Sequence, residues 1–218
     1  SMTISALTDK NILLTGTSGF VGKVVLEKIL RTLPGTGKIY LLLRPNRTHK
    51  TALERLHKDV LTSSIFNFLR NKLGSKFKPL VESRIRLVAG ECTEMNFNLV
   101  DFEFKRLADR IDIIIHSAAS VNFREPLDQA LEINTFALRN LIRLSRIADN
   151  CPLLHVSTCY VHGEHKGICK EENVFPKHLP ESDLLPHTPG GYYEIGPLLS
   201  HLEDKITELR QKLPHQAY

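Results

Sequence analysis

Three regularly spaced glycines follow the first apolar segment of the chain. They are Gly16, Gly19 and Gly22, and they lie between residues 11–15, a short apolar run, and residues 20–33, where apolar residues recur at helical spacing. A glycine turn between a strand and a helix brings unpaired backbone N–H groups and the positive end of the helix dipole to an anion. Gly16 would allow the tight turn, Gly19 the approach of a pyrophosphate, and Gly22 close packing of helix on sheet. The spacing therefore predicts a dinucleotide site, with a purely structural turn as the alternative.

The second predicted strand, residues 38–43, is followed by a basic stretch. Its four basic residues are Arg44, Arg47, His49 and Lys50, and it contains no carboxylate. An acidic side chain here would accept hydrogen bonds from the ribose 2′-hydroxyl of NAD, whereas guanidinium groups pair with the 2′-phosphate of NADP. The sequence therefore predicts NADPH as the cofactor, with a solvated basic loop as the alternative.

A regular arrangement of strands and helices must position these residues. Short apolar segments that alternate with longer helical patterns predict such an arrangement. The expected strands are residues 11–15, 38–43, 84–89, 111–116 and 153–156, and the expected helices are 20–33, 51–73 (ending at Gly74), 127–147 and 198–213. Strands separated by helices pair in parallel, because each crossover returns the chain in the same direction. We therefore expect an α/β fold: a Rossmann-type doubly wound parallel sheet with helices on both faces and its ligand site at the carboxyl ends of the strands.

Composition narrows the class of protein. With 218 residues, 42% hydrophobic and 24% charged, the chain suits one globular domain or most of a larger one, and is neither disordered nor collagen-like. No apolar run approaches the ~20 residues of a membrane helix. A net charge of +5 is compatible with phosphate-bearing ligands but too diffuse to indicate nucleic acid. The cysteines show no C-x-x-C spacing and no secretory signal precedes Thr3, so we expect reduced cytoplasmic thiols and no metal site.

Six motifs are specific enough to compare with known families. They are Thr15-Gly-Thr-Ser-Gly-Phe-Val-Gly-Lys23, Leu41-Leu-Leu-Arg-Pro45, the helical insertion from Glu54 to Arg70, His116-Ser-Ala-Ala-Ser-Val-Asn-Phe123, Asn134-Thr-Phe-Ala-Leu-Arg-Asn-Leu141 and Val156-Ser-Thr-Cys-Tyr-Val161. Together they make the chain resemble the extended short-chain dehydrogenase/reductases, and within them the fatty acyl-CoA reductase (male-sterility) branch. The resemblance covers essentially the whole chain.

The resemblance implies an oxidoreductase that uses NADPH to reduce a fatty acyl-CoA thioester to an aldehyde or a primary alcohol. Residues 3–218 would then form an incomplete NAD(P)-binding domain, with residues 162–197 as a loop or lid. The residues expected at the cofactor are Gly16, Thr17, Gly19, Phe20, Val21, Gly22, Arg44, Arg47, Glu91, Cys92, Ser117, Ala118, Ala119 and Asn134. Two of these assignments carry alternatives. Asn134 could instead be a satisfied polar residue between sheet and helix, and Glu91 stands where the family often has aspartate, which leaves the adenine contacts open.

The resemblance also implies a catalytic Tyr-x-x-x-Lys pair, in which the lysine lets the phenol act as a general acid near neutral pH. No tyrosine in this sequence has a lysine four positions later, but Tyr218 ends the chain about sixty residues after Ser157, where the family pattern expects the tyrosine. The chain would then stop at its catalytic tyrosine and be inactive by itself. Thr158, or else Ser157, would hold the substrate carbonyl oxygen.

Two other functions fit the same residues. One is a reductase domain that acts on a carrier-bound thioester, and the other is a non-catalytic NADP-binding module. We expect a fatty acyl-CoA partner, no nucleic acid and no transmembrane segment; a homo-oligomer, and membrane attachment through regions outside this chain, are compatible with the sequence.

Overall fold

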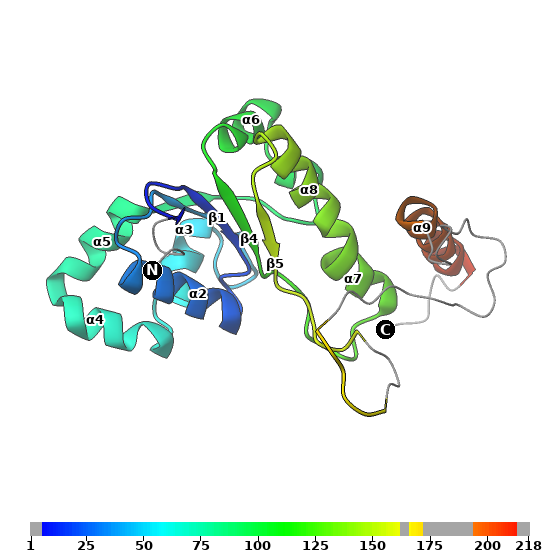
Figure 1. Ribbon diagram of the computed structural model, residues 1–218, viewed down its shortest axis with the longest axis horizontal. Helices are drawn as coiled ribbons and strands as arrows, with labels where there is room; N and C mark the ends of the chain where they lie inside the picture. Colours follow the sequence, from blue (N-terminus) through cyan, green and yellow to red (C-terminus); the bar gives the residue numbers. More distant parts are fainter. Residues whose placement is uncertain (1–5, 162–165, 172–193, 213–218) are drawn as a thin grey trace. The chain divides into compact units, whose positions relative to one another are not determined.

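The computed structural model describes residues 6–161, 166–171 and 194–212. Its centre is a five-stranded sheet in the order β3-β2-β1-β4-β5 (Figure 1). The strands are β1 (Ile12–Thr15), β2 (Ile39–Leu42), β3 (Ile85–Val88), β4 (Ile113–His116) and β5 (Leu153–His155). All four pairings are parallel, so the carboxyl ends of all five strands lie at one edge. The predicted Rossmann-type doubly wound sheet is confirmed, and each predicted strand lies within two residues of its observed bounds.

Helical segments connect these strands, and one more, α9, follows β5. They are α2 (Phe20–Thr32), α3 (Ala52–Arg55), η1 (Leu56–Val60), η2 (Ser64–Phe66), α4 (Asn67–Leu73), η3 (Gly74–Lys76), α5 (Phe77–Arg84), η4 (Met95–Asn98), α6 (Asp101–Ala108), α7 (Leu127–Leu131), η5 (Glu132–Phe136), α8 (Ala137–Ile147) and α9 (Ile195–Lys212). η1 and η5 are π-helical turns, and η2, η3 and η4 are 3₁₀ turns.

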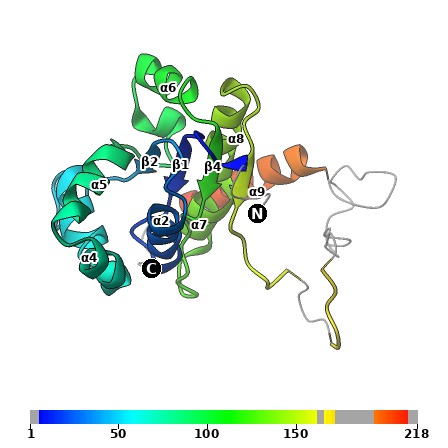
Figure 2. The ribbon, with the colours of Figure 1, turned by 60° about the vertical axis from the view of Figure 1, so that its left-hand side comes forward.

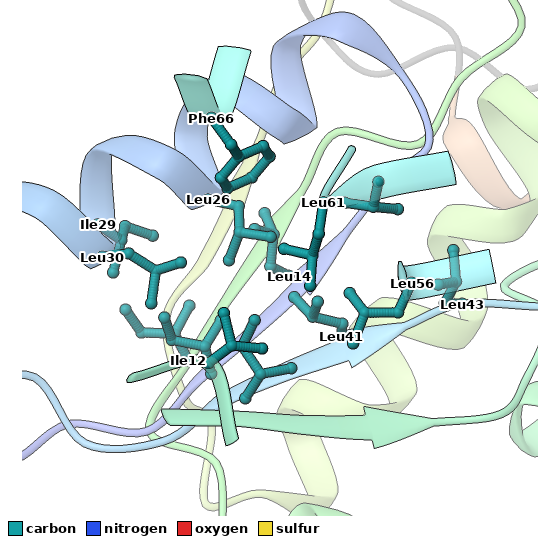
Figure 3. Packing of buried hydrophobic residues seen from close by; sticks show 14 of the residues in the cluster. Ile12, Leu14, Leu26, Ile29, Leu30, Leu41, Leu43, Leu56, Leu61 and Phe66 are labelled. Carbon is teal, nitrogen blue, oxygen red and sulfur yellow. The ribbon is translucent and has the colours of Figure 1, made fainter. Parts of the chain in front are cut away.

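A separate apolar core covers each face of the sheet, because successive strand residues point to opposite sides. On one face, Ile12 and Leu14 of β1 pack with Leu26 of α2 and with the helices between β2 and β3. Figure 3 shows this packing from close by. On the other face, Leu13 packs with α6 and α8. In Figure 2 the strands accordingly lie between α4 and α5 on one side and α8 on the other.

The helices differ from the sequence-based expectation in three places. The segment expected as one or two helices over 51–73 is broken into α3, η1, η2 and α4, and Gly74 (φ 52°) caps its end as expected. The helix expected over 127–147 contains the π-turn η5. Helices α5 and α6 were not predicted. Each of these differences lies in a connection and leaves the sheet unchanged.

The chain divides into two compact units, Ser1–Ser157 and Thr158–Tyr218. The first contains the whole sheet. The second contains α9, which matches the helix expected over 198–213. The segment expected to be a loop or lid, 162–197, falls mostly outside the described residues, as does Tyr218. Among the helices that the structure describes, none is long and apolar enough to cross a membrane.

Candidate functional site

A cavity of about 800 Å³ opens at the carboxyl ends of the strands in the first unit. It lies where the chain leaves β1 in one direction and β4 in the other, which is where doubly wound sheets bind their ligands. Its walls come from the glycine turn, the ends of β2, β3 and β4, and the start of the α7–η5 helical segment. The lining residues from these elements include Gly16, Thr17, Gly19, Arg44, Arg55, Glu91, Cys92, Ser117, Ala118, Ala119, Glu125, Gln129 and Glu132.

The glycines of the turn have distinct roles. Gly16 has φ 79°, and a Cβ there would lie 2.5 Å from the carbonyl carbon of Ser117, so only glycine fits beside β4. A Cβ on Gly22 would lie 2.1 Å from the carbonyl oxygen of Gly16, so α2 can approach the turn only without a side chain. At Gly19 the nearest atom to a Cβ is 3.3 Å away. Gly16 and Gly22 are therefore required by packing, whereas Gly19 borders the cavity.

The start of α2 is suited to hold an anion. Gly19 is its N-cap and provides no side-chain hydrogen bond, and no acidic residue lies in the first turn. The first N–H groups of the helix and its positive dipole end therefore remain available to a ligand. Beside them, Thr17 is fully buried, and its Oγ1 has no hydrogen-bond partner in the described part of the chain. A buried hydroxyl without a partner is costly, so this cradle fits a phosphate group that would supply one.

Thr15 and His116 join the ends of β1 and β4 below the cavity. Their Oγ1 and Nδ1 atoms are 2.7 Å apart, and both residues are buried. Ser117 closes the same corner by donating from Oγ to the carbonyl oxygen of Thr15 at 3.0 Å. Burial, followed by the electrostatic effect of His155, whose ring stacks on it, lowers the pKa of His116 to about 4. His116 is therefore a neutral core residue.

The side of the cavity formed by the ends of β2 and β3 carries residues of opposite charge. Arg44, just after β2, forms an ion pair with Glu91, just after β3, with 2.6 Å between Nη1 and Oε2. Arg55 donates from Nη1 to the carbonyl oxygen of Arg44 at 2.9 Å and pairs with Asp59 at 3.3 Å. Two guanidinium groups thus border this side. They could bind a 2′-phosphate, which pairs well with guanidinium.

Cys92 is an inert neighbour of these charges. It is buried, its Sγ lies 3.7 Å from Oε1 of Glu91, and its carbonyl oxygen accepts from Nδ2 of Asn140 at 3.0 Å. Burial, followed by the negative charge of Glu91, raises the pKa of the thiol to about 11. Cys92 therefore stays protonated near neutral pH and is a wall residue rather than a nucleophile.

Asn134 supports the wall of the cavity from outside it. Its Oδ1 accepts from the backbone N–H of Ser120 at 2.8 Å, and its Nδ2 donates to the carbonyl oxygen of Ser120 at 3.1 Å. Ser120 lines the cavity and Asn134 does not. The structure therefore shows the satisfied polar residue that was the alternative for Asn134, and a direct cofactor contact stays a prediction.

The other expected site residues are placed as follows. Of the fourteen expected cofactor residues, nine line the cavity; Phe20, Val21, Gly22, Arg47 and Asn134 do not. Phe20 and Val21 are exposed in the first turn of α2, and Arg47 is exposed beyond Arg44.

The expected catalytic hydroxyls follow β5. Ser157 ends the first unit, and Thr158 begins the second, so the structure does not relate Thr158 to the cavity. The backbone N–H of Tyr160 donates to Oγ1 of Thr158 at 3.1 Å, which leaves the Thr158 hydroxyl able to donate to a substrate oxygen. Tyr218 lies outside the described residues, so the structure does not test its role.

Sequence reasoning did not assign several of the lining residues to the site, and among them are the polar or charged Arg55, Glu125, Gln129 and Glu132. Oε2 of Glu125 accepts from Oγ of Ser120 at 2.5 Å, so it also fixes the loop after β4. Glu125, Gln129 and Glu132 lie outside the six motifs, whereas Arg55 lies in the helical insertion from Glu54 to Arg70. Arg55 alone had a signal, since it lies in the helical segment directly after the basic stretch.

The comparisons with known proteins agree with this geometry. Residues 14–216 match the family model described as "Male sterility protein". The chain is 41% identical over 172 residues to fatty acyl-CoA reductase 1 of Arabidopsis thaliana, covering 78% of this chain and 35% of that protein. It is 35% identical over 178 residues to the alcohol-forming fatty acyl-CoA reductase of Simmondsia chinensis, covering 81% and 35%. The chain thus spans about a third of the length of these curated relatives.

Among solved structures, the chain is similar to the terminal R domain from the myxalamid PKS-NRPS biosynthetic pathway. The TM-score is 0.62 with 30% identity, covering 77% of this chain and 40% of that one. A second similar structure is the reductase (R) domain of a non-ribosomal peptide synthetase from Mycobacterium tuberculosis, with TM-score 0.56, 25% identity and coverage of 76% and 39%. The match to the family model covers nearly the whole sequence, and the chain therefore belongs to the male sterility protein family of NAD(P)-binding domains.

Proposed function

We propose that this chain is the NADPH-binding part of a reductase that acts on fatty acyl-CoA thioesters. The single observation that carries the choice of cofactor is that Arg44 lines the cavity where an NAD-binding site would present a carboxylate from the end of β2, with Arg55 beside it. The relatives named above as fatty acyl-CoA reductases support the substrate class.

The residues of this chain would divide the cofactor between them. The start of α2, with Gly19 and Thr17, would bind the pyrophosphate through N–H groups and a hydroxyl. Arg44 and Arg55 would bind the 2′-phosphate. The small residues Ser117, Ala118 and Ala119 would let the rest of the molecule lie against the end of β4. The bound cofactor supplies the hydride for the reduction.

Thr158 is the residue of this chain that we assign to the substrate. Its hydroxyl accepts from the N–H of Tyr160 and would donate to the thioester carbonyl oxygen, where negative charge develops as hydride arrives. Proton donation would need a tyrosine with a lysine four positions later, and no tyrosine of these 218 residues has one, so we expect the 218-residue chain to bind cofactor without turning over substrate.

The cofactor assignment is tested by titrating the chain with NADPH and NADH, following nucleotide fluorescence. We expect NADPH to bind at least about tenfold more tightly, because the phosphate adds charge-assisted hydrogen bonds to guanidinium. Arg44→Asp should remove most of that preference, and Lys72→Asp, an equal charge change at an exposed helix position outside the cavity, should leave it unchanged. Equal affinities in the unsubstituted chain would contradict the assignment.

A second candidate function is supported by the solved structures, because both similar domains belong to peptide synthetase or mixed assembly lines. The alternative substrate is a thioester on a carrier protein. Turnover assays with the full-length protein distinguish the two: NADPH oxidation with free long-chain acyl-CoA supports the first function, and oxidation only with an acylated carrier protein supports the second. Cofactor binding without oxidation of either substrate indicates a non-catalytic NADP-binding module.

A further inference from the structure

The carboxylate of Glu91 forms an ion pair with Arg44, one of the two arginines that we assign to the 2′-phosphate. Oε2 of Glu91 is buried and has no hydrogen-bond partner in the described part of the chain, so the guanidinium of Arg44, 2.6 Å away, supplies its compensating charge. Both residues line the same end of the cavity. We propose that Glu91 is a specificity-determining residue that competes with the cofactor's 2′-phosphate for Arg44 and so weakens the preference for NADPH over NADH.

Strand pairing brings Arg44 and Glu91 close together. β2 and β3 are parallel neighbours in which Leu42 pairs with Val88, and Leu43 extends the pairing through its N–H to the carbonyl oxygen of Val88 at 3.0 Å. Arg44 and Glu91 therefore leave the same edge of the sheet side by side. Beyond the paired strand ends their side chains meet, with 2.6 Å between Nη1 of Arg44 and Oε2 of Glu91.

The two partners differ in mobility. Glu91 is fixed, because its N–H donates to the carbonyl oxygen of Phe97 at 3.0 Å, and Phe97 is fully buried. Gly90 on its other side packs closely too, since a Cβ there would lie 2.6 Å from the same carbonyl oxygen. The side chain of Glu91 is 20% exposed, whereas that of Arg44 is 63% exposed. Arg44 can therefore swing from the carboxylate to a phosphate, while the carboxylate stays in place.

The exchange has two costs for a phosphorylated cofactor. Arg44 must leave a buried oxygen without its compensating charge, which is unfavourable. The dianionic phosphate must then lie near that carboxylate, and like charges repel. A cofactor with a 2′-hydroxyl avoids both costs. Glu91 therefore acts against the phosphate specifically, whatever contact it makes with the adenine shared by both cofactors.

The inference rests on the proposed function, and nucleotide fragments test it apart from activity. Isothermal titration of the full 218-residue chain with 2′,5′-ADP and with 5′-AMP gives the ratio of their affinities, which isolates the 2′-phosphate. We expect Glu91→Gln, of nearly the same shape, to raise this ratio about five- to tenfold at low salt. Glu91→Asp, which keeps the charge but shortens the reach to Arg44, should raise it less. Glu94→Gln in the same loop is exposed, lies outside the cavity and should leave the ratio unchanged.

The outcomes separate this inference from the proposed function. A ratio in Glu91→Gln that equals or falls below that of the unsubstituted chain would overturn the role of Glu91, and a fall would mean that Glu91 orients Arg44 for the phosphate. If the unsubstituted chain prefers 2′,5′-ADP in that case, the proposed cofactor stands. Absence of 2′,5′-ADP binding by every variant would overturn both. Thermal unfolding of each variant verifies that it is folded, and a folded Glu91→Asp keeps the test valid if the glutamine variant does not fold.

Discussion

Thr15 and His116 form a buried hydrogen bond whose direction is fixed by their neighbours. The hydroxyl oxygen of Thr15 accepts from the backbone N–H groups of Ser117 at 3.2 Å and Ala118 at 3.3 Å. Its own hydrogen must then go to Nδ1 of His116, 2.7 Å away, so the ring is neutral with its proton on Nε2. The corner between β1 and β4, on which the wall of the cavity rests, therefore depends on a neutral histidine.

The first prediction is that stability falls in mild acid. The pKa of His116 is lowered to about 4 in the folded chain, mainly by burial and then by His155, from 6.5 when unfolded. Between these values the unfolded state binds more protons, so the free energy of unfolding decreases as pH falls from 6.5 to 4. For this one group the loss reaches about 3 kcal/mol. Urea unfolding across this pH range measures it.

His116→Asn is the matched variant, because Oδ1 of asparagine can still accept from Thr15 and does not titrate. Its stability should depend less steeply on pH over the same window, while His57→Asn in the exposed part of η1 should keep the full dependence. An unchanged slope in His116→Asn would show that other groups cause the acid sensitivity.

The second prediction separates the packing glycines from the binding glycine. Gly22→Ala places a Cβ 2.1 Å from the carbonyl oxygen of Gly16, so we expect a stability loss of about 3 kcal/mol or more, or failure to fold.

At Gly19, by contrast, the Cβ of an alanine meets nothing closer than 3.3 Å, and the backbone conformation is ordinary, with φ −86°. Gly19→Ala should fold with a similar melting temperature yet bind NADPH at least about tenfold more weakly, since the Cβ intrudes where the pyrophosphate must approach. Gly19→Val should abolish binding altogether. Undiminished binding by a folded Gly19→Val would place the pyrophosphate elsewhere.

The sheet could be predicted because each strand is indicated by residues that are close together in the sequence. Each strand is a short apolar run bounded by glycine, proline or charged residues, and the alternation with helices fixes parallel pairing. The helices α5 and α6 were missed for physical reasons. α5 carries Pro79 in its first turn and buries only Val81. Half of the residues of α6 are charged, and its buried residues are Phe104, Leu107 and Ala108. Tertiary packing of a few side chains stabilises both, which a periodic pattern does not reveal.

The residues of the site likewise divide into those that the sequence predicts and those that it does not. The glycine turn, Arg44 and the residues after β4 follow strands directly, so their place at the carboxyl edge could be predicted. Arg55 and Glu125 reach the cavity from connections whose path depends on the fold. The pairing of Arg44 with Glu91 needed only one more step, the adjacency of β2 and β3, because residues just beyond paired strand ends must be neighbours.

The third prediction concerns thiol reactivity. Cys159 and Cys169 are exposed, whereas Cys92 and Cys151 are buried. Burial raises the pKa of Cys151, and burial together with Glu91 raises that of Cys92 to about 11. With a coloured disulfide reagent at mildly alkaline pH we therefore expect two fast thiols, and two more only after unfolding. Cys92→Ser should keep both fast thiols and Cys159→Ser should lose one; the reverse result would contradict the buried position of Cys92.

The fourth prediction decides between the two roles of Asn134. Its amide both accepts from and donates to the backbone of Ser120, so Asn134→Asp keeps the acceptor and sets a carboxylate oxygen against the Ser120 carbonyl. If Asn134 acts by holding this wall, the variant should lose about 1 kcal/mol of stability, as expected for a lost hydrogen bond, and bind NADPH about tenfold more weakly. Asn71→Asp, exposed on α4, is the control and should change neither quantity. Weaker binding with unchanged thermal unfolding would instead indicate that Asn134 contacts the cofactor itself, because a direct contact contributes nothing to the stability of the unliganded chain.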